Sequence, residues 1–126
     1  RPVYIYPEFD ETMELNMAVS PEKIERLLEE HKEVQAVVLT SPTYDGGVVD
    51  IERISEICTS EKKIPLIVDE AHGAHFGFHP YFFRRMQIQK GADVVIHSLH
   101  KTLPALTQTA LIHLNGTRID RREDRN

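Results

Sequence analysis

The sequence predicts an α/β fold with a mostly parallel β-sheet and flanking helices. Short apolar runs recur along the chain, each bounded by turn-forming residues, and segments with helical periodicity separate them. The runs in residues 36–40 and 93–97 are continuous rather than alternating, as expected of strands that are covered on both faces. Because strands that alternate with helices form βαβ units, most of the strands are expected to be parallel.

Five apolar runs are the candidate strands. The first is Val3–Tyr6, close to the start of the chain. The other four are expected to form the central sheet, with the first three of these four parallel: Ala36–Thr40, Ile64–Val68, Asp93–His97 and Ala110–Leu114. An Asn-Gly pair, which is a turn signal, follows the last run.

Three helices are expected between these strands. Ser20 is an N-cap candidate with Pro21 at the first helical position, and the apolar residues that follow share one face. Asp50 can cap a second helix, which also has a single apolar face. A third helix is expected over Phe82–Lys90, ending at Gly91.

Composition and charge narrow the possible functions. The 126 residues are 40% hydrophobic and 28% charged, which is typical of a globular domain rather than a disordered chain. The net charge of −5 argues against a nucleic-acid partner. No apolar run approaches the roughly 18 residues of a membrane span, and no secretory signal opens the chain, so no membrane partner is expected. The single cysteine, Cys58, cannot form an internal disulfide, which favours a reducing, cytoplasmic location.

The ends of the chain indicate a piece of a longer protein. The chain begins Arg1-Pro2 without a methionine and passes at once into an apolar run. Residues 117–126 carry four arginines and three acidic residues, with little to bury, so we expect a polar tail or the start of a following segment. Residues 1–116 are then the folded domain.

Polar, titratable residues follow the predicted strands, where ligands collect in an open parallel sheet. Asp69 and His72 come after one buried strand, and Ser98 and Lys101 come after the next, so we expect all four to converge on one edge. A lysine that is partly desolvated can act as a neutral amine and hold a carbonyl cofactor, while a neighbouring aspartate can keep a pyridine nitrogen protonated. The alternative is that Asp69 caps the next loop and Lys101 is simply solvated.

Three segments resemble the major domain of the bacterial ornithine/lysine/arginine decarboxylases, which are pyridoxal-phosphate enzymes of fold type I. They read TSPTYDG at residues 40–46, PLIVDEAHGAHFGFHP at 65–80 and GADVVIHSLHKTLPALTQTA at 91–110. The resemblance implies that residues 1–116 are part of this domain, with Val3–Tyr6 as the third strand of its sheet and Ala110–Leu114 as the antiparallel seventh. The Asp-Glu-Ala-His element alone is shared with α-oxoamine synthases and other fold-type-I enzymes such as aminotransferases, which stay open as alternatives.

Position by position, the resemblance implies a role for seven residues. Lys101 is the Schiff-base lysine, Asp69 pairs with the pyridinium nitrogen, and His72 lies near the phenolic oxygen of the cofactor. These three are the expected catalytic residues. The remaining cofactor contacts are Ala71 against the ring, Ser98 and His100 on the phosphate side, and Thr43 near the ring.

The implied reaction is decarboxylation of arginine, lysine or ornithine to the corresponding amine, as in polyamine biosynthesis, with pyridoxal 5'-phosphate as cofactor. The family carries, upstream of this stretch, a Gly/Ser/Thr loop for the cofactor phosphate and a ring-stacking histidine, and no residues here match them. We therefore expect the isolated chain to be inactive. It is also expected to be a homo-oligomer, because unpaired strand edges take partners. A non-catalytic truncated remnant is the remaining alternative.

The seven histidines raise a competing hypothesis, a zinc hydrolase site. His72, His75 and His79 are closely spaced, but no HExxH motif is present, and Gly77 and Pro80 interrupt any helix that would align them. We expect no metal site, and hydrogen bonds within a loop for these histidines. A nearby aromatic cluster is expected to form core or a subunit contact: Phe76, Phe78, Tyr81, Phe82 and Phe83.

Overall fold

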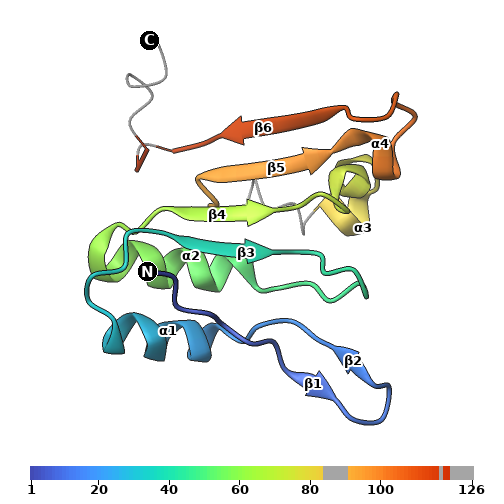
Figure 1. Ribbon diagram of the computed structural model, residues 1–126. Coiled ribbons are helices and arrows are strands. Elements are labelled where there is room, and N and C mark those ends of the chain that lie inside the picture. The colour runs from blue at the N-terminus through green and yellow to red at the C-terminus, as the bar shows by residue number, and fades with distance from the viewer. Residues whose placement is uncertain (84–90, 117, 120–126) are drawn as a thin grey trace.

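The computed structural model describes residues 1–83, 91–116 and 118–119 (Figure 1). Its elements follow one another as β1 (Phe9–Asp10), β2 (Leu15–Asn16), α1 (Pro21–Glu30), β3 (Val37–Thr40), α2 (Ile51–Lys62), β4 (Leu66–Asp69), the 3₁₀ helix η1 (Ala74–Phe78), α3 (Pro80–Phe83), β5 (Val94–Ser98), α4 (Leu99–Thr102) and β6 (Ala110–Leu114). Within these ranges no helix is long and apolar enough to cross a membrane.

The central sheet confirms the predicted α/β class. Its four strands lie in the order β3-β4-β5-β6, with β3, β4 and β5 parallel and β6 antiparallel to β5. Three of the strands begin one or two residues later than expected, and β4 and β5 run on to Asp69 and Ser98. The register places Asp69 between Thr40 on β3 and Ile96 on β5, while Ser98 lies opposite Ala110 on β6.

The N-terminal segment differs from the prediction. Val3–Tyr6 is not a strand, because a strand needs a neighbour to pair with and no described residue pairs with this segment. The first regular structure along the chain is instead the short β1–β2 hairpin (Figure 1). Asp10 closes its turn, since one carboxylate oxygen accepts hydrogen bonds from the backbone N–H groups of Thr12 and Met13 at 2.8 and 2.9 Å.

Two of the expected helices form as predicted. α1 begins at Pro21 after Ser20, although the Ser20 hydroxyl makes no capping hydrogen bond. α2 begins after Asp50, whose Oδ1 accepts a hydrogen bond from the backbone N–H of Arg53 at 3.1 Å. Of the third expected helix, Phe82–Lys90, only the first two residues lie in the described ranges, at the end of the short helix α3.

One face of the sheet carries the core. Alternate strand residues pack with the apolar faces of α1 and α2 in a single cluster: Ile24, Leu28, Ile51, Ile54, Ile57, Cys58, Val37, Leu39, Leu66, Val68 and Val95. The opposite face is open, since Val38 on β3 is 64% exposed and Ile112 on β6 is 67% exposed. The expectation that both faces are covered is therefore wrong for the described residues. A continuous apolar run shows that both faces of a strand are apolar, not that both are covered.

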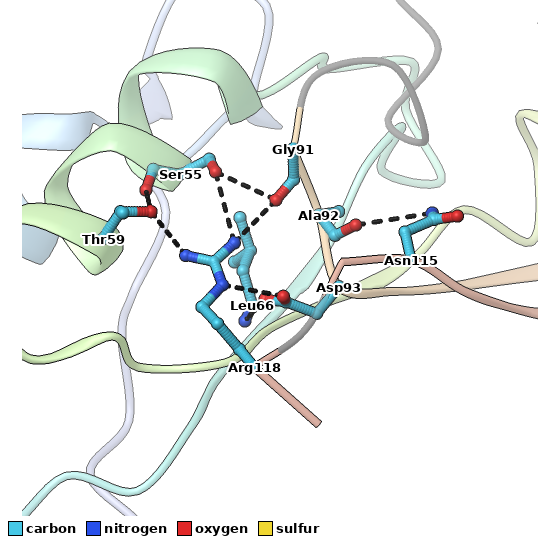
Figure 2. A network of polar contacts seen from close by, with 8 residues as sticks. All are labelled: Ser55, Thr59, Leu66, Gly91, Ala92, Asp93, Asn115 and Arg118. Carbon is cyan, nitrogen blue, oxygen red and sulfur yellow. Dashed lines mark hydrogen bonds and ion pairs between the residues drawn. The ribbon is translucent and has the colours of Figure 1, made fainter. Parts of the chain in front are cut away.

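A network of polar contacts closes the end of the sheet where β5 begins (Figure 2). The buried carboxylate of Asp93 accepts from the backbone N–H of Leu66 at 2.7 Å and from Nε of Arg118 at 2.7 Å. The Arg118 guanidinium also donates to the Thr59 hydroxyl of α2 and to the Gly91 carbonyl, at 2.6 and 2.8 Å. Arg118, in the segment expected to be a polar tail, thus joins the folded part, while residues 117 and 120–126 lie outside the described ranges.

Candidate functional site

The predicted site residues lie on elements that end at one edge of the sheet. β4 ends at Asp69 and β5, parallel to it, ends at Ser98, so both strands deliver their last residues to the same side (Figure 1). His72 follows β4 in the turn before η1, and Lys101 lies in α4, directly after β5. Neighbouring strands of a sheet are about 4.8 Å apart, so the loops after β4 and β5 are adjacent.

Asp69 keeps one carboxylate oxygen for a further donor. The residue is half-buried, and its Oδ1 accepts a hydrogen bond from the backbone N–H of Ala71 at 3.0 Å. Its backbone carbonyl accepts from the N–H of Ser41, which fixes the end of β4 against the loop after β3. The alternative that Asp69 caps its own loop is thus observed for one oxygen, while Oδ2 makes no hydrogen bond to the described residues.

Lys101 is exposed on α4, and within the described residues its amine takes part in no hydrogen bond or ion pair. Of the two alternatives that the sequence left open for Lys101, the described residues show the solvated side chain. The short helix is nevertheless held in place. The N–H of Leu99 donates to the carbonyl of Thr109 at 2.9 Å, and Nδ1 of His100 lies 3.0 Å from the same oxygen.

His100 and Ser98 differ in how far the protein already uses their polar atoms. A carbonyl oxygen only accepts, so Nδ1 of His100 carries the proton in its contact with Thr109, and Nε2 is left for another partner. Ser98 is the N-cap residue of α4, but its hydroxyl makes no capping hydrogen bond. Both residues can therefore contribute a polar group at this edge.

A pocket of about 390 Å³ is lined by the loop after β3 and by the segment after β4, but not by Asp69, Ser98, His100 or Lys101. His72 is half-buried there, and its ring meets the ring of Tyr44 edge-on, with 6.0 Å between the centroids. Thr43 also lines the pocket, yet its hydroxyl oxygen accepts from the N–H of Gly47 at 2.9 Å and so serves its own loop. Ala71, expected against the cofactor ring, is buried with 8% of its surface exposed. The remaining lining residues are Pro42, Gly46, Val48, His75, Phe76 and Tyr81.

The zinc hypothesis gains no support. Among the described residues, no three histidine, cysteine or acidic side chains are arranged to hold a metal ion. His79 accepts a hydrogen bond from the N–H of Tyr81, and the His75 ring packs edge-on against Phe76. Of the expected aromatic cluster, Phe76 is buried, whereas Phe78 is 77% exposed. The side chains of Phe82 and Phe83 lie outside what the structure describes.

A chain of three polar side chains, of which Glu70 and His97 are buried and His113 is half-buried, was not predicted. Nε2 of His97 lies 2.6 Å from Oε2 of Glu70, and Nδ1 of His97 lies 3.1 Å from Nε2 of His113 on β6. The Glu70 and His97 side chains are 0% and 6% exposed. Their positions in the sequence could have indicated this contact. Glu70 follows Asp69 and His97 precedes Ser98, and neighbouring residues of a strand point to opposite faces of the sheet. Glu70 and His97 therefore point to the covered face.

Comparison with known proteins assigns the family. The profile of the Orn/Lys/Arg decarboxylase major domain matches residues 1–126. This chain belongs to the Orn/Lys/Arg decarboxylase family.

Individual relatives agree with the family assignment. The chain is 42% identical over 123 residues to YaaO of Bacillus subtilis, described as uncharacterized, and 34% identical over 113 residues to the arginine decarboxylase of the same species. It is 33% identical over 93 residues to lysine decarboxylase LdcA of Pseudomonas aeruginosa. These matches cover 95%, 90% and 68% of this chain but only 25%, 23% and 12% of the relatives, so the chain spans a quarter of their length or less.

Solved structures support the fold. The crystal structure of mouse CSAD in apo form superposes with a TM-score of 0.62 and 27% identity, covering 82% of this chain and 22% of that one. A second structure of mouse CSAD gives a TM-score of 0.61 at 22% identity, covering 92% of this chain and 24% of that one, and shows the shared fold. The chain of the Orn/Lys/Arg decarboxylase family is thus a partial fold-type-I domain, as the resemblance implied.

Proposed function

We propose that the protein carrying this chain decarboxylates a basic amino acid, either arginine, lysine or ornithine, with pyridoxal 5'-phosphate as cofactor. The observation that carries the proposal is the placement of Asp69 and Lys101 at the ends of adjacent parallel strands, in a chain of the Orn/Lys/Arg decarboxylase family. The basic class of substrate rests on relatives named arginine decarboxylase and lysine decarboxylase.

The residues present fit the functional groups of the cofactor. Pyridoxal 5'-phosphate has a pyridine nitrogen, an aldehyde, a phenolic oxygen and a phosphate. Asp69 has an uncommitted carboxylate oxygen for a protonated nitrogen, and Lys101 has an uncommitted amine for the aldehyde. Ser98 and His100 have polar atoms left for the phosphate, and His72 lines the pocket at the loops after β3 and β4. Ala71 has a side chain small enough to leave room for the ring.

Each proposed residue then has one physical task. When bound, the cofactor supplies a conjugated ring that accepts the electron pair left as CO₂ departs. Asp69 holds a proton on the ring nitrogen, because an adjacent carboxylate stabilises the charged form. Lys101 would hold the cofactor at its aldehyde carbon, with loss of water, and, once the substrate amine has displaced it, would return a proton to the substrate Cα. His72 donates to or accepts from the phenolic oxygen.

The contact between His100 and Thr109 determines when His100 can donate a hydrogen bond to the cofactor phosphate. Because Nδ1 of His100 donates to the Thr109 carbonyl, Nε2 carries a second proton only when the ring is cationic. His100 can therefore donate to a phosphate oxygen only as the imidazolium.

The test is release of CO₂ from arginine, lysine and ornithine by the full-length protein with added cofactor. We expect turnover of one of the three in the ordinary enzyme range of about 1–10³ per second. Lys101→Ala should abolish it, whereas Lys32→Ala, a change at an exposed lysine outside the site, should not. Turnover that survives Lys101→Ala, or none with any of the three amino acids, would contradict the proposal.

A further inference from the structure

Glu70 and His97 form a buried bridge directly behind the proposed site. Glu70 follows Asp69 in the chain, and His97 precedes Ser98 and the helix that carries Lys101. Their side chains meet at 2.6 Å with 0% and 6% exposure. Because a buried carboxylate is costly without a partner, this contact is held tightly. It connects the loop after β4 to the end of β5 by a side-chain bond.

Two further contacts extend the bridge. The backbone N–H of Glu70 donates to the carbonyl of Ile96 at 2.9 Å, so the start of the loop after β4 is also hydrogen-bonded to β5 through the backbone. On the other side, the His97 and His113 rings meet edge-on, with Nδ1 of His97 and Nε2 of His113 3.1 Å apart, which requires one of these two nitrogens to carry a hydrogen. His97 is thereby fixed at both ring nitrogens, between β4 and β6. Its ring cannot turn without breaking a contact.

We infer that the Glu70–His97 bridge positions Asp69 relative to Lys101. The inference rests on the proposed function, because it assigns the bridge a task in that site. Neither side chain is a catalytic residue, since both point away from the exposed edge into the covered side of the sheet. The bridge acts through the backbone: it holds the two loops at the spacing that a ring between Asp69 and Lys101 needs. Small errors in such spacing are costly, because a shift of about 1 Å can reduce a rate by about 100-fold.

The chain offers a matched control at the other end of β5. Asp93 and Arg118 form an ion pair between buried or nearly buried side chains, with a distance of 2.7 Å and exposures of 2% and 13% (Figure 2). This pair also ties β4, β5 and the segment after β6 together, but it lies where β5 begins rather than where β5 ends. Disrupting it weakens the same sheet without touching the loops that carry Asp69 and Lys101.

The experiment compares three variants of the full-length protein: His97→Leu, His97→Gln and Arg118→Met. Each is mixed with pyridoxal 5'-phosphate, the adduct is trapped with borohydride, and the fraction modified at Lys101 is measured by mass spectrometry; kcat, KM and the melting temperature are measured alongside. In His97→Leu we expect the fraction trapped at Lys101 and kcat to fall by about tenfold or more, with little change in KM. His97→Gln should restore both to within about threefold, because its amide can donate to Glu70. Arg118→Met should lower the melting temperature but leave trapping at Lys101 intact.

The inference is overturned if His97→Leu traps cofactor and turns over as the wild type does. It is also overturned if trapping at Lys101 and kcat are as low in His97→Gln as in His97→Leu. A third contradicting result is that Arg118→Met, at a similar loss of melting temperature, loses as much trapping as His97→Leu. Failure of the proposed function looks different, because the wild type itself would then show no adduct at Lys101. That result would contradict both proposals, whereas the other results would contradict only the positioning role of the Glu70–His97 contact.

Discussion

Gly73 lies in the turn after β4, against the buried side chain of Glu70. A Cβ at this position would stand 2.4 Å from Cγ of Glu70 and 3.0 Å from Cδ of Pro42. Glu70 cannot swing away, because its carboxylate is bound to His97 at 2.6 Å. We predict that Gly73→Ala lowers the free energy of unfolding by about 1–3 kcal/mol through overpacking, measured by urea denaturation.

The control for this prediction is Asp45→Ala, at an exposed residue of the loop after β3. Its free energy of unfolding should stay within about 0.5 kcal/mol of the wild type. If Gly73→Ala proved as stable as Asp45→Ala, the close packing of the turn against Glu70 would be wrong.

His113 makes the stability of the chain depend on pH. Burial first, and then the neighbouring His97, lower the pKa of His113 below its usual value. Near and below the ordinary histidine value of about 6.5, the unfolded chain therefore binds more protons than the folded chain, so stability falls as the pH falls through that value. We predict that His113→Gln reduces the loss of stability on going from neutral to mildly acid pH, measured as the shift in urea midpoint. Equal shifts in variant and wild type would count against this account.

At the scale of elements, Arg118 joins the segment after β6 to α2 and β5. Its partner Asp93 is 2% exposed, so loss of the guanidinium leaves a carboxylate buried without its counter-charge. We predict that Arg118→Met lowers the free energy of unfolding by about 3 kcal/mol. Arg53→Met breaks the exposed pair with Glu56 and should cost less than about 1 kcal/mol. Equal losses for the two variants, measured by urea denaturation, would show that burial of Asp93 does not matter.

The strands of the sheet could be predicted because their cause is local. Val94, Val95 and Ile96 favour extended backbone and are bounded by turn formers, and the alternation with helices fixes the parallel direction. Val3–Tyr6 has a similar composition, yet it is not a strand, because pairing depends on a neighbour that the described residues do not supply. A sequence pattern records the tendency of a segment, not whether a partner lies beside it.

The candidate site also has features that could be predicted from the sequence and features that could not. The placement of Asp69 and Lys101 follows from their positions directly after strands, and this could be predicted. The bond between Glu70 and His97 could not, because it depends on the register of β4 with β5 and on the face that each side chain takes. The sequence left the exposure of Lys101 open between two alternatives, because it depends on which elements cover α4.

At the scale of the whole molecule, one face of the sheet exposes apolar side chains that no described element covers. Val38, Ile112 and Leu114 are apolar and exposed on the face opposite α1 and α2. Among the described strands, β3 and β6 each have one unpaired edge. Exposed apolar patches and free strand edges both favour association with another copy. We therefore propose that the 126-residue chain forms a homo-oligomer, and we expect it to be inactive on its own, as the resemblance implies.

Light scattering tests the association, with Ile112→Lys and Leu106→Lys as a matched pair. Ile112 is 67% exposed on the open face, and Leu106 is 86% exposed on the loop before β6. We predict a dimer or larger species for the wild type and for Leu106→Lys, and a shift toward monomer for Ile112→Lys, because a charge on the open face opposes its burial. A stable wild-type monomer would contradict the prediction.

We propose that Asp69 and Lys101 hold pyridoxal 5'-phosphate where β4 and β5 end. The most direct measurement is the absorbance of the full-length protein after addition of the cofactor. We predict an absorbance band at about 420 nm. This band should be lost in Lys101→Ala and weakened in Asp69→Asn, but unchanged in Lys32→Ala. A band that persists in Lys101→Ala, or the absence of any band in the wild type, would contradict the claim.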